Sequence, residues 1–478
     1  MLFVSKIYLC LFLPITLIGF YVLVHRKQTS AAIGWLVAAS LFFYGWWNPQ
    51  YLILLLGSVG FNYLLGSAMS RRKPRSRPAL LGIALLGNLG LLGYYKYANF
   101  FVNTANQFTG SHFHLDTIIL PLAISFFTLQ QIAYVVDAYR GDAPAYPFWR
   151  YSLFVTFFPQ LIAGPIVHHR RLLPQFTKSQ LPGFDADNLS RGLSLFFVGM
   201  FKKVMIADQL APWVAVAFNA PPETTLSTSQ AWISTYAYHF QIYFDFSGYS
   251  DMAVGAALMF NIRLPHNFNS PFQATNIRNA WRRWHITLSD FVMRYLYAPL
   301  GANKRGALVG YRNLFIAFVA TGVWHGAGWN FALFGVVHGL AVMLHQTWKN
   351  RGFSMPAWLG LLLTFNFWAW ALVLFRAPDF ATIGRVYAAM LDFGPLSMPD
   401  STHLAPIAWL LILLPVVWLI PNTMTIFQAP SSQETTPRWR WSPSARWGLL
   451  IAGLAIFTVF RPIQSLQSAN QAFIYFQF

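Results

Sequence analysis

Long runs of apolar residues alternate with short polar or basic stretches along the whole chain of 478 residues. A run of roughly 20 apolar residues is long enough to cross the ~30 Å hydrocarbon core of a bilayer as a helix. The pattern therefore predicts an all-α, polytopic membrane protein that forms a single transmembrane domain over residues 1–478. It places helices near residues 7–24, 31–47, 51–69, 79–101, 118–137, 193–218, 230–260, 357–375, 406–420 and 447–460.

Charged residues, glycine and proline interrupt this apolar pattern at residues 148–175 and 281–348. Non-helical backbone at membrane depth is stable only where protein or a water-filled cavity satisfies its polar groups. We therefore expect re-entrant or half-buried segments in both regions. The stretches 377–405 and 421–446 are interrupted by proline. We expect interfacial helix or loop in these two stretches and no folded domain outside the membrane.

Composition and charge agree with a membrane protein. Hydrophobic residues make up 56% of the chain and charged residues 10%, whereas a soluble domain is about one quarter charged. The 33 basic residues outnumber the 14 acidic ones, and they lie in short loops, where basic residues orient membrane proteins and contact anionic lipids. We expect membrane lipids as partners and no nucleic acid. The single cysteine, Cys10, excludes an internal disulfide, a cysteine-based zinc site and an iron–sulfur cluster.

The charge of the loops predicts the orientation of the first helices. Residues 71–77 carry five basic side chains and residues 103–116 carry none, so the first loop is expected in the cytoplasm and the second outside. Labelling of Ser76→Cys and Ser111→Cys in intact cells, in a Cys10→Ser background, checks this orientation. We expect a membrane-impermeant maleimide to label Ser111→Cys alone. Labelling of Ser76→Cys from outside would contradict the predicted topology.

Two carboxylates, Asp245 and Asp251, lie within the helix predicted near residues 230–260. An ionised carboxylate at mid-membrane costs several kcal/mol unless it is paired. One interpretation is a structural ion pair or hydrogen-bonded anchor that faces the bundle interior, with Arg282 and Arg283 as partners. The other interpretation is a direct part in substrate binding or chemistry.

Tryptophans bracket three potentially cationic side chains in the segment Trp281–Ser289, which reads WRRWHITLS and contains Arg282, Arg283 and His285. One interpretation is an amphipathic helix whose arginines contact lipid head groups. The other is a clamp for a phosphorylated acyl donor, because guanidinium groups are planar, bidentate donors. The spacing of the residues does not separate the two.

His325 lies in a glycine-rich segment, Thr321–Phe331, between two apolar runs. A histidine in such a closely packed place can take a proton from a hydroxyl as a general base, or it can bridge helices as a core residue, which residue type alone favours. Trp324 and Asn330 are candidate donors to an oxyanion by proximity in sequence only. The chain has no His-Glu-x-x-His pattern, and we expect no metal site.

Several short motifs follow one another along the chain: Tyr94–Tyr97, Leu120–Thr128, Phe157–Ile166, Tyr243–Asp251, Trp281–Ser289, Trp324–Gly326 and Phe375–Ala377. In this order they resemble the membrane-bound O-acyltransferase (MBOAT) family, particularly its branch for O-acetylation of bacterial polysaccharides such as alginate. The resemblance covers almost the whole chain, with a family-like core at roughly 90–350. An ordered set of motifs is far more specific than a single Trp-His-Gly.

The resemblance implies roles for residues and an architecture. His325 matches the essential membrane histidine of the family, which favours the general-base interpretation, and His285 matches a second histidine characteristic of the branch. The implied fold is a ring of about 11 transmembrane helices, with re-entrant segments, around a central funnel whose narrow floor lies near the histidines. The residues expected to contact substrate are Arg282, Arg283, Asp245, Asp251, Trp324 and Asn330.

The implied activity is acetyl transfer across a bacterial inner membrane. The expected donor is a cytoplasmic thioester, acetyl-CoA, and no bound cofactor is expected. The expected acceptors are hydroxyls of an exported polysaccharide of the alginate or cellulose type, reached directly or through periplasmic acetylation proteins. A charged donor does not cross the bilayer, so a thinned protein centre lets the acetyl group meet an acceptor outside.

Two other functions compete with this interpretation. D-alanyl transfer to teichoic acid is a related acyl transfer. A polytopic transporter or flippase suits the intramembrane carboxylates and the broken helices equally well. It predicts paired half-repeats, which the sequence does not display.

Overall fold

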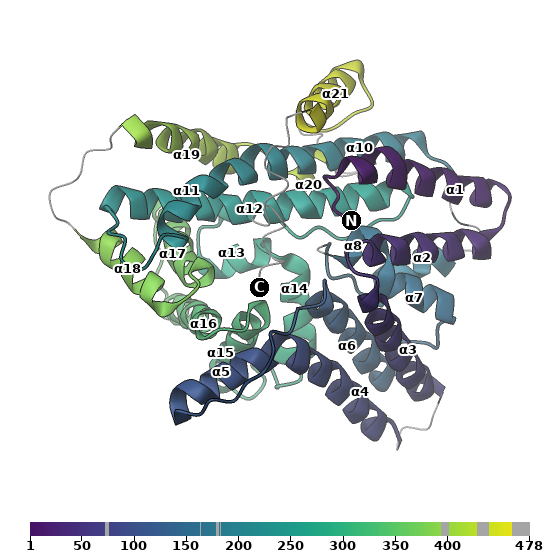
Figure 1. Ribbon diagram of the computed structural model, residues 1–478, viewed down its shortest axis with the longest axis horizontal. Helices are drawn as coiled ribbons and strands as arrows, with labels where there is room; N and C mark the ends of the chain where they lie inside the picture. The colour runs from purple at the N-terminus through teal and green to yellow at the C-terminus, as the bar shows by residue number, and fades with distance from the viewer. Residues whose placement is uncertain are drawn as a thin grey trace. The chain divides into compact units, whose positions relative to one another are not determined.

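The computed structural model describes residues 1–71, 76–162, 164–177, 181, 183–392, 401–427 and 439–460, and within these ranges it contains helices and no strand (Figure 1). Among them, six helical segments are long and apolar enough to cross a membrane: Tyr8–His25, Gln50–Arg71, Arg77–Thr109, Ala307–His325, Trp329–Asn350 and Ala357–Arg376. The expected all-α, multi-pass fold is confirmed. The count of about 11 helices and the ring around a funnel stay predictions.

The chain divides into two compact units, and the expectation of a single MBOAT-type domain stays a prediction. The first unit comprises Met1–Val198, Ser250–His266 and Ser442–Arg461. Among the described residues, the second unit comprises those of Gly199–Tyr249 and Asn267–Trp441. Helix α12, Thr228–Met259, contributes residues to both.

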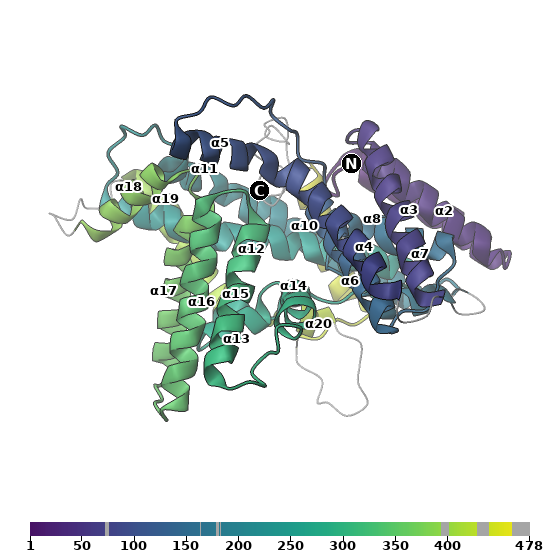
Figure 2. The ribbon, with the colours of Figure 1, turned by 90° about the horizontal axis from the view of Figure 1, so that it is seen from below.

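In the first unit, α3 (Gln50–Arg71), α4 (Arg77–Leu92) and α6 (Ile124–Arg140) lie side by side in both views (Figures 1 and 2). The buried amides of Asn62 and Asn88 bond each other across α3 and α4, with N···O distances of 2.6 and 3.2 Å. In an apolar interior each amide needs such a partner. This pairing therefore fixes the register of the two helices.

In the second unit, α15 (Ala307–His325) and α16 (Trp329–Asn350) form a tight helical hairpin, and α17 (Ala357–Arg376) packs beside α16 (Figure 2). A Cβ atom built on Gly335 would lie 2.5 Å from the carbonyl oxygen of Phe318, and one on Gly322 would lie 2.8 Å from the Gly335 nitrogen. The two backbones approach this closely only because both positions are glycine. This close packing fixes the position of the turn between α15 and α16.

The broken regions are partly as expected. Residues 148–175 contain short helices, α7 (Phe148–Thr156), α8 (Phe158–Leu161) and α9 (His169–Thr177). The expectation of a broken segment over all of 281–348 is wrong for its second half, where α15 and α16 are continuous. Asn313, a buried polar residue of α15, is satisfied there, because its amide donates to the carbonyls of Leu300 and Ala302 at 2.9 Å.

Proline-interrupted residues 377–405 and 421–446 contain α18 (Phe380–Leu391), the start of α19 (Ser401–Leu419), α20 (Thr423–Phe427) and the start of α21 (Ala445–Phe460). Helix was one of the two expected states. Residues 393–400 and 428–438, and residues 72–75 of the basic loop, lie outside the described residues.

Candidate active site

His325 is the last residue of α15, at the turn of the glycine hairpin. Its side chain is buried, with 5% of the residue exposed. The imidazole ring lies against the rings of Trp324 and Phe375, at centroid distances of 5.0 and 5.1 Å. The carbonyls at a helix C-terminus favour positive charge. A positive charge on the ring would be favoured at this position, and the role of His325 as general base stays a prediction.

His285 lies just before α14 (Ile286–Val292) with φ 42° and ψ 54°, in the left-handed region. This backbone conformation costs about 1–3 kcal/mol for a residue other than glycine, and such strain gathers at functional sites. Asn267 holds the turn in place, because its carbonyl accepts the Ile286 N–H at 3.0 Å and its Oδ1 accepts the Thr287 hydroxyl at 2.6 Å. Sequence analysis missed this role of Asn267.

Trp324 brings the two candidate catalytic histidines together. Its ring lies 5.0 Å from that of His325 and 6.3 Å from that of His285. On its other side, His285 packs edge-on against Phe246 of α12 at 4.8 Å. Three of the ordered motifs therefore meet in one buried aromatic cluster of the second unit.

Asn330 links the start of α16 to the end of α17. Its side-chain amide donates to the carbonyls of Leu374 and Ala377, at 3.1 and 3.0 Å. Both N–H bonds are thereby used, and the contact fixes the chain on either side of Phe375, which packs on His325. In this arrangement Asn330 positions the wall of the site, and a contact with substrate stays a prediction.

The two arginines before His285 have different surroundings. Arg283 is engaged, since its Nε donates to Asn279 Oδ1 at 2.5 Å and its Nη1 to the Asn269 carbonyl at 3.2 Å. Arg282 is exposed and lines a cavity of about 710 Å³ together with Arg278. The structure therefore separates a structural arginine from one that faces an open volume.

This cavity, which we call the α13–α16 cavity, lies between α13 (Ile277–Arg283), α14, α15 and α16. Its lining includes Ile286, the residue after His285, and Thr321, one helical turn before His325. Trp281 and Phe318 supply apolar walls. It thus combines two cationic groups with apolar walls, and it shares sequence neighbours with both histidines.

Asp245 is paired with a lysine that sequence analysis did not single out. Lys203 forms one ion pair with Asp245 and a second with Asp208, at 2.8 Å between Nζ and Oδ1. The expected partners Arg282 and Arg283 were therefore wrong, and the interpretation of Asp245 as part of a structural ion pair agrees with the geometry. Lys203 lies in a π-helix, η4 (Lys202–Ala207). Asp251 is buried and belongs to the first unit.

A second polar cluster, also missed in the sequence, lies in the first unit and joins α6 to α9. Nε2 of His168 and Nε2 of His169 lie 2.7 and 2.9 Å from the same oxygen, Oδ2 of Asp137. The Tyr146 hydroxyl lies 3.0 Å from Nδ1 of His169, and the backbone N–H of Arg170 donates to Nδ1 of His168 at 3.2 Å. We call this network the His–Asp–His clasp. The pair of adjacent histidines was its signal in the sequence.

Three ligating side chains within 4.8 Å of one another have the composition of a metal site. The hydrogen bonds oppose that use. Nδ1 of His168 accepts a hydrogen bond from the Arg170 N–H. The ring hydrogen therefore lies on Nε2, which donates it to Asp137. A metal bound at Nε2 would instead require a hydrogen on Nδ1, which would face the Arg170 N–H. The clasp is therefore a hydrogen-bonded link between helices, and the absence of a metal site stays a prediction.

The clasp makes stability depend on pH. Burial lowers the pKa of His169 below its ordinary value near 6.5, and the hydrogen bond to Asp137 only partly opposes this. The unfolded chain then binds more protons than the folded one, so the contribution of His169 to stability is complete above about pH 6.5 and is lost as the pH falls further. We expect the melting temperature to drop between about pH 7.5 and pH 5.5. His169→Gln, which keeps an N–H donor, should show a smaller drop in thermal unfolding assays, and an equal drop would contradict this assignment.

The comparisons with known proteins agree with these motifs. The model of the MBOAT, membrane-bound O-acyltransferase family, matches residues 143–377. The chain is 43% identical over 429 residues to the peptidoglycan O-acetyltransferase of Helicobacter pylori, which covers 83% of this chain and 81% of that protein. It is 38% identical over 410 residues to the probable alginate O-acetylase of Pseudomonas aeruginosa, covering 84% and 76%.

A teichoic acid D-alanyltransferase of Bacillus subtilis is 28% identical over 285 residues, covering 56% of this chain and 72% of that protein. His285 and His325 both lie within the stretch that the family model matches. The fold, the buried histidine cluster and these relatives lead to one conclusion. The chain is a multi-pass O-acyltransferase that belongs to the membrane-bound O-acyltransferase family, in its branch of bacterial polysaccharide O-acetylation.

Proposed function

We propose that this protein moves an acetyl group from cytoplasmic acetyl-CoA to hydroxyl groups of a glycan outside the bacterial cytoplasmic membrane. The observation that carries the proposal is the buried cluster of His285, Trp324 and His325, whose sequence neighbours Ile286 and Thr321 line a cavity that contains two arginines. A charged thioester stays on the cytoplasmic side, and its acetyl group reaches the cluster through the protein.

His325 acts as general base in this mechanism. Its ring takes the hydroxyl proton of the acceptor while the hydroxyl oxygen attacks the thioester carbonyl carbon. The tetrahedral intermediate collapses, the carbon–sulfur bond breaks, and the sulfur leaves with the proton that the imidazolium returns. Assistance of this kind contributes about 10²–10⁴-fold to the rate. His285 lies one ring away, on the far side of Trp324, and is a second candidate for contact with the reacting groups.

The α13–α16 cavity is the proposed donor route. Arg278 and Arg282 are the cationic groups of its lining, and guanidinium groups suit the phosphates of coenzyme A. Trp281 and Phe318 suit the less polar arm that carries the thioester. This arrangement supports the anion-clamp interpretation for Arg282 and leaves Arg283 as a structural residue.

The acceptor is proposed to be an envelope glycan. The relatives named above act on peptidoglycan or are named for alginate, and both polymers lie outside the cytoplasmic membrane. The same general-base chemistry fits two routes. The acetyl group is transferred to the glycan directly, or a periplasmic acetylation protein takes it first. D-alanyl transfer has less support, because the D-alanyltransferase relative covers just over half of this chain.

A deletion strain complemented with the wild-type gene tests the proposed reaction. Peptidoglycan sacculi and soluble exopolysaccharide are purified separately, and the ester-linked acetate released by mild alkali is measured in each. We expect acetate esters to disappear from one of the two fractions in the deletion strain and to return on complementation. Unchanged acetate in both fractions, or a selective loss of D-alanine esters, would overturn the proposal.

A further inference from the structure

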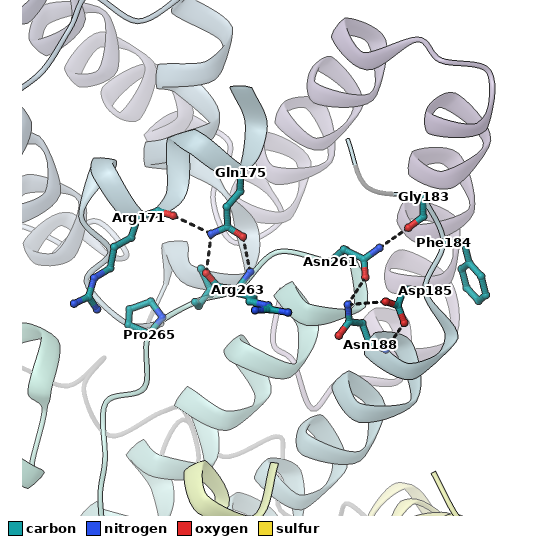
Figure 3. A pocket seen from close by; sticks show the side chains of 10 residues that line it. Arg171, Gln175, Gly183, Phe184, Asp185, Asn188, Asn261, Arg263 and Pro265 are labelled. Atoms are coloured by element: carbon teal, nitrogen blue, oxygen red, sulfur yellow. Dashed lines mark hydrogen bonds between the residues drawn. The ribbon is translucent and has the colours of Figure 1, made fainter. Parts of the chain in front are cut away.

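A second pocket, separate from the one used above, lies wholly within the first unit. It has a volume of about 850 Å³, and its walls come from α9, from the residues just before α10 (Ala186–Phe201) and from the chain after α12. Arg171 and Arg263 both line it. We call it the Arg171–Arg263 pocket (Figure 3).

The main chain around both arginines is fixed by one side chain. Gln175 donates to the carbonyls of Arg171 and Arg263 at 2.9 and 3.0 Å, and it accepts the Arg263 N–H at 2.9 Å (Figure 3). The opposite wall is tied together by Asn261, which donates to the Gly183 carbonyl at 2.6 Å. The His–Asp–His clasp holds the start of the same helix α9. The frame of the pocket is therefore built before any ligand enters.

Both guanidinium groups are available for a ligand. Within the described part of the chain neither has a hydrogen-bond or ion-pair partner, and no dashed line reaches either group in Figure 3. The neighbouring Arg170, in contrast, is paired with Asp142 at 2.7 Å. The one carboxylate of the pocket, Asp185, is engaged in capping α10 by accepting the Asn188 N–H at 2.9 Å. Two guanidinium groups against one carboxylate give the lining of the pocket a net positive charge.

The helix α9 that lines the pocket begins near the basic loop 71–77 of the same unit. Ser70, next to the basic loop 71–77, donates to the Ala143 carbonyl at 3.0 Å, and the adjacent Asp142 pairs with Arg170 at the start of α9. The excess of basic residues in that loop predicts that this end faces the cytoplasm. Ligands from the cytoplasm or from the cytoplasmic leaflet can therefore reach it.

We propose that the Arg171–Arg263 pocket binds the phosphate groups of an anionic ligand. Arg171 and Arg263 both line the pocket, and guanidinium groups suit phosphate oxygens, which accept bidentate hydrogen bonds. Phe184, which is 61% exposed at the rim, adds an aromatic ring for a flat or apolar neighbour of the phosphate. Two sources carry this chemistry at a cytoplasmic surface: the nucleotide part of the thioester donor, which rests on the proposed function and would be held here in place of Arg278 and Arg282, and the head group of an anionic phospholipid.

Binding measurements on the full chain in lipid nanodiscs test the proposal. Arg171→Gln, Arg263→Gln and the double variant are compared with Arg26→Gln, an exposed arginine of the same unit. One arm titrates coenzyme A, which carries no acetyl group, into nanodiscs of phosphatidylcholine. The other arm measures by native mass spectrometry how much phosphatidylglycerol each variant retains from mixed nanodiscs.

We expect affinity in one arm to fall about tenfold for each arginine removed and to stay unchanged in Arg26→Gln. A loss confined to coenzyme A identifies the donor as the ligand, and a loss confined to phosphatidylglycerol identifies the lipid. Unchanged affinity in both arms of the folded double variant overturns the proposal. Arg171→Lys and Arg263→Lys keep the charge and replace any glutamine variant that fails to fold. Because neither arm measures acetylation, failure of the proposed function would leave the binding result intact.

Discussion

Replacement of His325 by alanine is expected to lower glycan acetylation by about 10²–10⁴-fold while the protein remains inserted and abundant. The imidazole is the group placed to take the hydroxyl proton, and it lies at the turn of the α15–α16 hairpin, where its removal leaves the glycine contacts of that hairpin intact. Ester-linked acetate, measured per amount of protein detected in the membrane, gives the effect. His325→Gln, which keeps a polar side chain of similar volume, should be as inactive.

His338 is the matched control, because it is a fully buried histidine of the same hairpin. It accepts a hydrogen bond from Trp281 Nε1 at 3.1 Å and packs among the rings of Phe334, Phe367 and Trp368. For His338→Ala we expect activity to fall in step with protein level, because the lost contacts are packing contacts. Near-normal acetylation by a fully expressed His325→Ala variant would remove His325 from the mechanism and direct attention to His285.

Replacement of Lys203 by methionine is expected to lower the free energy of unfolding by about 3–5 kcal/mol. Lys203 forms ion pairs with two carboxylates, of which the Asp245 side chain is only 1% exposed, and methionine would remove both ion pairs. Chemical or thermal unfolding of the purified protein in detergent measures the loss.

The triple variant Lys203→Met, Asp208→Asn, Asp245→Asn is the control for this prediction. It removes all three charges together, and we expect it to regain most of the lost stability, because the cost lies in keeping two buried negative charges after their ion pairs with Lys203 are lost. A Lys203→Met variant within about 0.5 kcal/mol of wild type would show that the ion pairs contribute nothing measurable.

The parts of this architecture that follow from local pattern could be predicted from the sequence. The apolar runs predicted the helices, and the glycine-rich segment around His325 indicated that this residue is a candidate for the site. Lys203 was missed because Lys202 and Lys203 change the hydropathy of the long apolar stretch 193–218 only slightly, although an intramembrane cation is itself a signal of a paired site. The clasp was missed because Asp137 and His168 are 31 residues apart and their contact depends on how α6 and α9 pack.

The pairing of Asp245 shows a second reason for failure. Arg282 and Arg283 were the partners expected from the sequence. The actual partner precedes Asp245 in the chain, on η4, and meets it through tertiary packing that residue spacing does not encode. Nearness in sequence predicted that Trp324 lies beside His325, because the two residues are adjacent in the chain. It did not predict the ion pair of Asp245 with Lys203.

The left-handed backbone at His285 predicts which residues laboratory selection would favour at this position. Glycine adopts φ 42° without a steric penalty, so His285→Gly relieves strain at the same time as it removes the ring. A library selected only for thermal tolerance should therefore accumulate glycine at this position, whereas one selected for acetylated glycan should keep histidine if the ring takes part in the reaction. The divergence of the two libraries at one codon would measure how much stability the enzyme gives up for the side chain at position 285.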